Sequence, residues 1–453
     1  MITSKDIDIA KHCISYATCN GADAVRVSMS TSTLDSVTML NGVLDKVTHA
    51  SDKSVYLYIF ANGRYGTFST NRLEINAIEE FIDQAIAMVK MLEEDCFRSL
   101  PSSERTAKDA RTGQELGLFD SRYKDSDSDS RMVRAKEMSI LSRISQDDYR
   151  LISEECEYSE YCEDNFVADS QGFEGRHTET SFSVFTEMTI QDTEGGKYSG
   201  YWWESSFNKD EISPEGCSRK ALERAVRQIG PKKRRSGQYK MVVDTNVATK
   251  LISPIISALN ASAMQQKMSF LEGSLEQRVL PEGFTLMDLA RTPGKNGSRL
   301  YDTEGVATKD SYIIRDGVVK QYFVNTYISR KLGIEPTIED ISRPCLQPFI
   351  KGRSLSSQEK GLSLEDLVQI TGNGILVTGF NGGNCNPVTG DFSFGIEGFA
   401  IKRGKISHPV REMLITGNIL DLWNNLTAVG SDARSSVRWQ VGSLAFDNVS
   451  FSA

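Results

Sequence analysis

The stretch GNGILVTGFNGGNCNPVTGDFSFGIEGF, residues 372–399, decides the fold of the C-terminal half of this chain. It sets glycines and asparagines among apolar residues that read as β-strands, although strands normally avoid both residue types. Glycine inside a strand marks a bulge, a positive φ angle or a close approach of another backbone. Apolar runs at 375–377 and 392–394 flank the glycine and asparagine cluster. The stretch therefore predicts paired strands with an accessible backbone, whereas the competing interpretation is a series of ordinary β-turns.

Outward from this stretch, the chain alternates between helical and strand patterns. Apolar residues at helical spacing predict helices, and short β-branched runs separated by Asn-Gly turns predict an antiparallel meander. A calcium loop is excluded at Asp125–Asp129, because Ser130 and Lys136 replace the required glycine and glutamate, and a helix start is expected instead. The expected elements are a helix capped by Ser4, a meander over 22–70, a helix over 78–92, a helix over 131–145, strands to 203 with a strand–turn–strand element at 168–173, a helix over 213–229, a strand at 239–244 and a helix over 247–259.

These patterns predict an α+β fold with helices packed on mostly antiparallel sheets. A chain of 453 residues is too long for one ordinary core, so several domains are expected. We expect an α+β unit over 1–100, a second α+β unit over 101–230 and a sheet-rich domain over 238–453. The principal boundary is expected near 231–237.

Composition and charge restrict the function classes. The net charge of −9 and pI near 5.3 weigh against a nucleic-acid partner, and the one basic cluster, Lys232–Arg235, is typical of a solvated loop. Neither a leader nor an apolar membrane span is visible, so a cytoplasmic protein without a membrane partner is expected. Eight cysteines lie scattered without a Cys-x-x-Cys pair, which favours reduced structural thiols over a zinc ribbon.

Several motifs together resemble the C-terminal signature of the TldD/PmbA family. They are Val377–Phe380, Asn386–Ser393, Asp302–Val306, Thr326–Gly333, Pro409–Glu412 and Ile415–Asn418. The resemblance covers the whole chain and is strongest from about Gln238 onward. It implies a metallopeptidase assembly. Members also carry the label "modulator of DNA gyrase", which the composition gives no reason to interpret as DNA binding.

The zinc motif of the family's metal-binding subunit is missing from this sequence. That subunit carries His-Glu-x-x-x-His on the helix that follows the strand, where two imidazoles can share a zinc ion and the glutamate can activate water. Here the helix over 247–259 has no histidine or glutamate. No cysteine follows Cys385 to supply the family's late ligand. The four histidines, His12, His49, His177 and His408, lack the required spacing. His177 is expected at the surface and His408 in a structural role.

The resemblance therefore implies the PmbA-like (TldE) branch, without metal, cofactor or catalytic residues of its own. Its implied partner is a TldD-like metal-binding subunit in a heterodimer, or a second copy of itself. Its implied ligand is unfolded peptide, which can add as a strand to an exposed sheet edge. The residues expected to offer that edge are Gly379, Phe380, Asn381, Gly382, Gly383 and Asn384.

Two other functions remain open on sequence grounds. One is a self-sufficient hydrolase that uses Cys385, or the carboxylates Asp302, Glu304 and Asp391. The other is a homodimeric interaction protein without a peptidase partner. No nucleophile elbow, phosphate-binding loop or dinucleotide fingerprint supports a further class of enzyme. A catalytic cysteine also needs an activating base, which the sequence does not assign to Cys385.

Overall fold

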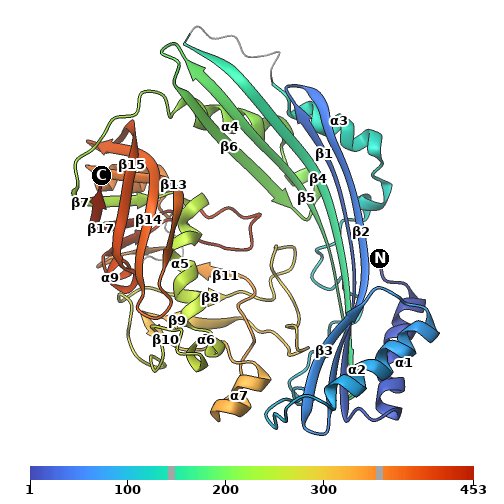
Figure 1. The fold of residues 1–453 in the computed structure, drawn as a ribbon. Helices are drawn as coiled ribbons and strands as arrows, with labels where there is room; N and C mark the ends of the chain where they lie inside the picture. Colours follow the sequence, from blue (N-terminus) through green and yellow to red (C-terminus); the bar gives the residue numbers. More distant parts are fainter. Residues whose placement is uncertain (141–147, 354–360) are drawn as a thin grey trace. The chain divides into compact units, whose positions relative to one another are not determined.

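The computed structural model describes residues 1–140, 148–353 and 361–453 (Figure 1). The chain forms two compact units. Unit 1 comprises Met1–Glu223, Arg291–Lys309 and Asn325–Glu339, and unit 2 comprises Arg224–Ala290, Asp310–Val324 and Asp340–Ala453. Two segments of the C-terminal half therefore belong to the unit that the N-terminal half builds. The three domain ranges expected from the sequence stay a prediction.

Unit 1 is built on one six-stranded antiparallel sheet with the order β3-β2-β1-β4-β5-β6. Its strands are β1 (Ala24–Leu40), β2 (Val43–Ala61), β3 (Arg64–Thr70), β4 (Tyr149–Asp169), β5 (Glu174–Asp192) and β6 (Lys197–Ser206). The predicted meander is confirmed as β1–β3, with Asn41 and Asn62 at positive φ in the turns that join its strands. The strand–turn–strand prediction is confirmed where β4 passes into β5. The strands are long, up to 21 residues in β4, and buried and accessible residues alternate along the middle of that strand.

Helices cover one face of this sheet. They are α1 (Ser4–Cys19), α2 (Ile75–Val89), α3 (Ser128–Met138) and most of α4 (Pro214–Val226). Unit 1 also contains the shorter helix α7 (Thr326–Leu332) and the 3-10 helices η1 (Ser121–Asp125) and η3 (Lys209–Glu211). Thr3, and not Ser4 as expected, caps α1: its side chain and that of Asp6 form a reciprocal capping box. Asp127 caps α3 in the same way, so the acidic run is a helix start, as predicted.

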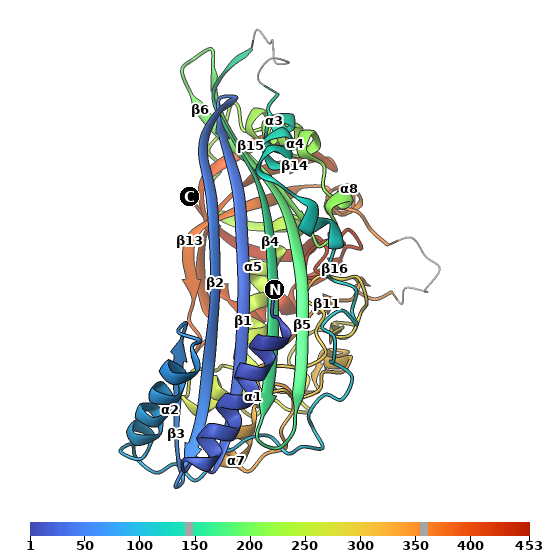
Figure 2. The same cartoon turned by 90° about the vertical axis from the view of Figure 1, so that its right-hand side faces the viewer.

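The two ends of the helix-covered face hold two apolar clusters. Alternate residues of a strand point to the same face, and those of β1 enter both clusters. Val25, Val27 and Met29 pack with α1 and α2, whereas Val37 and Met39 pack with α3 and with Cys217 of α4. Figure 2 shows α1 lying across the strands, with α3 toward the opposite end. The strands therefore stay paired along the stretch that separates the two apolar clusters.

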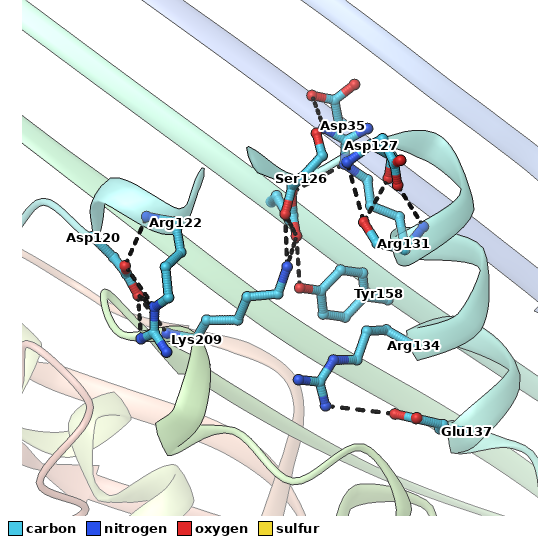
Figure 3. A network of polar contacts seen from close by, with 12 residues as sticks. Asp35, Asp120, Arg122, Ser126, Asp127, Arg131, Arg134, Glu137, Tyr158 and Lys209 are labelled. Atoms are coloured by element: carbon cyan, nitrogen blue, oxygen red, sulfur yellow. Dashed lines mark hydrogen bonds and ion pairs between the residues drawn. The ribbon is translucent and has the colours of Figure 1, made fainter. Parts of the chain in front are cut away.

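The middle of the same face is charged. Glu160 of β4 is fully buried, and its carboxylate accepts hydrogen bonds from Arg131 Nε at 3.0 Å, Lys209 Nζ at 3.0 Å and the Tyr158 hydroxyl at 2.8 Å. Arg131, which α3 contributes, also contacts Asp35 of β1 at 3.1 Å (Figure 3). These ion pairs attach α3 and η3 to the sheet beside the apolar cluster that contains Tyr158.

The inserted segments of the C-terminal half pack into unit 1. Leu300 and Tyr301 are buried in one cluster with Phe173 and with apolar residues of the 101–130 tract. Arg98 lies over the Tyr327 ring at 3.5 Å, which joins α7 to the segment after α2. Unit 1 is thus completed by residues that lie far along the chain.

Unit 2 contains a seven-stranded sheet whose pairings close into a ring. β17 pairs with both β15 and β7, so β7, β13, β14, β15 and β17 follow one another around the ring. Among the described strands of this sheet, β7 and β13 alone pair in parallel. The strands are β7 (Gly237–Val243), β12 (Phe349–Ile350), β13 (Gly374–Cys385), β14 (Asp391–Lys402), β15 (Lys405–Asn418), β16 (Leu426–Val429) and β17 (Leu444–Ser452), and a second sheet holds β8 (Leu286–Asp288), β9 (Ser311–Arg315), β10 (Val318–Val319) and β11 (Pro344–Leu346).

The core of unit 2 includes Trp423 of α9 (Ile419–Asn424), which is fully buried. Its ring packs edge-on against Phe284 and Phe446, and its Nε1–H donates to the Leu251 carbonyl of α5 (Thr245–Ala258). Two further helices complete the unit, α6 (Ala261–Gln265) and α8 (Leu364–Thr371).

The α+β prediction with mostly antiparallel sheets is confirmed. The helices expected over 78–92, 213–229 and 247–259 are found as α2, α4 and α5, with ends shifted by a few residues. The helix expected over 131–145 begins earlier, at Ser128, and ends at Met138, while residues 141–147 lie outside the described chain. In the part of the chain that the structure describes, no helix is long and apolar enough to cross a membrane.

Candidate functional site

The candidate site begins where β13 loses one of its two neighbours. Ile375–Val377 pair with β14 on one side and with β7 on the other. The chain then leaves β7 at Asp244, which caps α5 by accepting the Asn246 backbone N–H. Beyond Val377, β13 continues to Cys385 with β14 as its only strand partner among the described residues. The predicted segment 379–384 is therefore the free edge of a sheet.

A β-bulge shapes this edge. Gly382 and Gly383 together lie opposite the single residue Phe394, because the register shifts between Asn381 and Asn384. Both glycines have positive φ, +63° and +78°. The bulge is the physical reason for the Gly-Gly pair, and the residues on either side of it are exposed.

The two bulge glycines have different surroundings. A Cβ at Gly383 would lie 1.9 Å from the Ser393 carbonyl oxygen, whereas a Cβ at Gly382 would meet nothing within 4 Å. Gly383 is therefore required by strand pairing. At residue 382, glycine is required only because the backbone has a positive φ angle. A side chain there would point into open space.

Side chains along the edge form a small aromatic and polar surface. Phe380 packs edge-on against Phe394, with ring centroids 5.7 Å apart, and Lys250 of α5 lies 5.0 Å from the Phe394 ring. The amide of Asn381 donates to Glu397 at 2.8 Å. These contacts hold the side chains of Phe380 and Asn381 against β14, while the glycines leave the backbone of the edge uncovered.

Arg224, near the end of α4, contacts Thr378, the first residue of the free edge. Its Nη2 donates to the Thr378 carbonyl at 3.2 Å, and its Nη1 lies 4.0 Å from the Asp244 carboxylate. Sequence reasoning missed this residue, because Arg224 is 154 positions from Thr378. Nothing in a single sequence pairs a helix-end arginine with one particular strand.

Cys385 closes the edge and lacks the setting of a nucleophile. Its Sγ lies 3.5 Å from the Gly390 carbonyl oxygen, and burial and then the charge of Asp391 raise the pKa of the thiol. The unit's one histidine, His408, flanks Pro409, which pairs with Phe399, whereas Cys385 pairs with Phe392. The two pairs lie seven positions apart along β14, about 20 Å or more in an extended strand. His408 therefore does not act as a base for this thiol.

The carboxylates considered as an alternative site do not come from one unit. Asp302 and Glu304 belong to unit 1 and Asp391 to unit 2. Asp302 Oδ1 accepts the backbone N–H groups of Glu304 and Val306, and Glu304 accepts the backbone N–H and hydroxyl of Thr326. Asp302 and Glu304 thus hold the two inserted segments of unit 1 together, a structural role.

Asp302 should make stability depend on pH. Burial, then the charge of Glu304, raises its pKa to about 6, above the ordinary 3.8. A group whose pKa is higher in the folded state stabilises the fold at pH values below its pKa in the unfolded state. This stabilisation is lost as the pH rises through its pKa in the folded state. Relative to Asp302→Asn, the wild-type chain should gain about 2 kcal/mol in free energy of unfolding from pH 7 to pH 4.5. Urea unfolding of both proteins at the two pH values measures this gain, and a constant difference between them contradicts it.

The residues on α5 do not fit a zinc ion. Its buried face consists of aliphatic side chains such as Leu251, Ile252 and Ile255, and its polar residues are Thr, Asn, Lys and Ser, which are not zinc ligands of the family type. Over residues 1–140, 148–353 and 361–453, no three His, Cys, Asp or Glu side chains gather in a way that could hold a metal ion. The side chains of the described residues therefore do not fit the metal of the family's metal-binding subunit.

The four histidines each lie beside a partner of their own. His12 contacts Glu79, His49 contacts Asp35, His177 contacts Glu179 and His408 contacts Ser407, at 2.7–3.2 Å. His177, expected at the surface, is half-buried. The first three belong to unit 1 and only His408 to unit 2.

Comparison with known proteins gives matches over nearly the whole chain. Three family models match in order: domain 1 of the PmbA/TldA metallopeptidases over residues 25–89, their central domain over 77–229 and their C-terminal domain over 236–453. A relative described as a metalloprotease PmbA homolog, from Buchnera aphidicola, is 27% identical over 92% of this chain and 90% of its own length.

Solved structures agree with these models. A crystal structure from Bacteroides thetaiotaomicron, described as a proposed modulator of DNA gyrase, is 37% identical and superimposes with a TM-score of 0.93 over 100% of both chains. The structure of TldE from Thermococcus kodakarensis shares the fold, with a TM-score of 0.82 at 17% identity over 98% of this chain and 100% of its own. By sequence models and by structure, this chain belongs to the PmbA/TldD metallopeptidase family.

Proposed function

We propose that this chain is the non-metal subunit of a TldD/TldE-type metallopeptidase and that it binds unfolded peptide for a TldD-like subunit in the cytoplasm. The observation that carries the proposal is the free edge of β13, Thr378–Cys385, beside a helix without metal ligands. Family membership supplies the metallopeptidase context. The side chains of α5, which include no zinc ligand of the family type, support the proposal that the partner carries out the hydrolysis.

The edge would hold a peptide by strand addition. The uncovered N–H and C=O groups of Gly379–Asn384 can pair with any extended backbone, so binding would depend little on peptide sequence. Arg224 fixes the carbonyl of Thr378, where a bound strand would begin beside the end of β7. The bulge at Gly382 and Gly383 bends the far end of the edge, and this limits uncontrolled pairing.

Reconstitution tests the proposal. The chain alone should not cleave an unfolded peptide, and adding a TldD-like subunit that carries His-Glu-x-x-x-His should produce cleavage that depends on both chains. Gly382→Val should reduce that cleavage about tenfold by raising the KM for peptide, because a β-branched side chain disfavours positive φ and reshapes the edge. Peptide turnover at several substrate concentrations separates KM from kcat.

Gly230→Val is the matched control. Gly230 has φ +72° and, like Gly382, would place its Cβ in open space, but it lies in the loop before β7. Equal losses in both variants would mean that backbone strain, and not the edge, causes the effect. Peptidase activity of the lone chain that disappears in Cys385→Ser would reject the proposal in favour of a cysteine hydrolase. Stable self-association without any cleavage on addition of the partner would favour the interaction protein.

A further inference from the structure

Two basic segments that lie far apart along the chain meet on unit 2. They are the loop Lys232–Arg235 before β7 and the hairpin Lys402–Lys405, which joins β14 to β15. Gly404 N donates to the Gly372 carbonyl at 2.7 Å, which holds the hairpin turn in place. Arg234 Nη1 donates at 3.4 Å to the carbonyl two residues beyond Gly372, which holds the loop. The loop and the hairpin together form one basic surface.

This basic surface holds its positive charges close together with little neutralisation. Most of its cationic side chains are exposed. Among the described residues, Lys233 alone of this set has a carboxylate partner, Glu412, at 3.3 Å. His408 lies beside the surface, and burial, then the charge of Lys402 and two charges of the loop, lower the pKa of its imidazole. His408 therefore experiences positive charge from both segments.

The turn of the hairpin is unfavourable for the residue that occupies it. Both central residues have positive φ, Arg403 at +50° and Gly404 at +72°. Such turns favour Asn-Gly or Asp-Gly, because most side chains are strained in the left-handed region. The turns after β1, β2 and β9 follow this rule, with Asn41, Asn62 and Asp316 at the equivalent position. An arginine at this position needs a reason outside the turn.

The strands that flank the turn add a second unfavourable feature. Lys402 and Lys405 pair directly across the hairpin. Like charges in directly opposite positions destabilise an antiparallel pair. Departures from such local rules are expected where a residue serves a function. Both departures here have the same effect, which is to add positive charge to the basic surface.

We propose that the basic surface binds an acidic segment of another polypeptide, an extended stretch with several aspartate or glutamate side chains. Charge complementarity carries the choice of partner. A nucleic acid is charged along its whole length, and this chain has a net charge of −9, so a long polyanion is repelled by the rest of the molecule. A short acidic segment meets only the basic surface. The free edge of β13 pairs with residues 392–397 of β14, before the hairpin, so the two surfaces are distinct.

Fluorescence anisotropy of a labelled peptide tests the binding on the full chain alone, independently of the proposed peptidase role. A peptide of about ten residues in which glutamate and glycine alternate should bind, and should bind about tenfold more weakly when NaCl rises from about 50 to about 300 mM. The same peptide with glutamine in place of glutamate should not bind. Absence of binding of the glutamate peptide at low salt overturns the proposal. A single-stranded oligonucleotide of equal charge that binds more tightly also overturns it, because the partner is then a nucleic acid.

Charge reversal tests the position of the site. Lys402→Glu/Lys405→Glu should weaken binding of the glutamate peptide about tenfold. This double variant keeps a like-charge pair across the hairpin, so strand pairing changes little. Lys5→Glu/Lys197→Glu is the matched control, because it makes the same charge change at two exposed lysines of unit 1. Equal weakening in both double variants means that net charge alone governs binding, and the site is rejected.

Arg403→Asn separates binding from folding. The variant creates the Asn-Gly turn that follows β1 and β2, so it should raise the midpoint of thermal unfolding. It should also weaken binding of the glutamate peptide about threefold, because one positive charge is lost. A variant that is more stable and binds less well marks a position kept for its ligand. Unchanged affinity in this variant overturns the proposal.

Nuclear magnetic resonance of the histidine side chains locates the bound peptide. Bound carboxylates offset the cations that lower the pKa of His408, so the glutamate peptide should raise this pKa. His12 of unit 1 is the control, and its signals at constant pH should not move when the peptide is added. Signals that move equally at both histidines, or at neither, reject the basic surface as the binding site.

Discussion

Replacing Glu160 with alanine should lower the free energy of unfolding of this chain by about 3–5 kcal/mol, because it leaves two cations without their shared carboxylate in a buried setting. Arg131 and Lys209 both contact Glu160 at 3.0 Å. Arg131 keeps its contact with Asp35, whereas Lys209 loses the carboxylate that neutralises its ammonium group. Urea unfolding followed by circular dichroism measures the loss.

Glu155→Ala is the control for this experiment. Glu155 lies on the same strand but is exposed, so the same change should stay within about 0.5 kcal/mol of the wild type. The loss should also depend on pH. Burial raises the pKa of Glu160, but hydrogen bonds from Lys209, Tyr158 and Ser126 outweigh it and hold the pKa below its usual value. The stabilisation by the ionised Glu160 is thus present at pH values above the ordinary pKa of glutamate. It is lost as the pH falls below that pKa and through the lowered pKa of the folded state. A difference between wild type and Glu160→Ala that does not shrink at low pH contradicts this account.

Gly383→Ala should destabilise unit 2 by about 2–6 kcal/mol, the sum of strain at positive φ and of a forced separation of backbones. Its Cβ would lie 1.9 Å from the Ser393 carbonyl oxygen, so β13 and β14 must move apart at the bulge. Hydrogen exchange of the amides along β13 and β14, together with thermal unfolding, measures the change.

Gly382→Ala separates the two causes. This residue has a similar φ but open space around its Cβ position, so only the strain should remain, about 1–2 kcal/mol. If the two alanine variants are equally stable, steric conflict with Ser393 does not shape the bulge. The pair also shows why Gly382 is the better position for functional tests. A change at Gly383 alters the strand pairing itself.

Elements with a regular local pattern could be predicted from the sequence. The alternation along β1 and the Asn-Gly turns gave the meander, and helical spacing gave α1 and α5. The glycines and asparagines at 379–384 also carried a local signal, since a bulge needs residues that accept positive φ. Family membership followed from motifs whose order along the chain is specific.

Pairings between distant segments could not be predicted. The free edge of β13 exists because β7 ends at Val243, and no pattern within residues 372–399 contains that fact. The contact between Arg224 and Thr378 depends equally on how α4 is placed. Composition likewise does not show that Leu300 and Tyr301 pack against Phe173. Such contacts are set by tertiary packing and leave no local period.

The inserted segments of unit 1 have a consequence for synthesis. The chain passes between its two units after residues 223, 290, 309, 324 and 339. A ribosome must therefore translate most of the protein before unit 1 holds all of its parts, on the order of ten seconds after the last strand of its sheet has been made. During this interval Phe173 lacks its partner Tyr301, so the nascent sheet displays apolar surface of the kind that chaperones bind. The order of translation thus delays completion of unit 1 until Glu339 has been made, although its first strands are among the earliest parts of the chain.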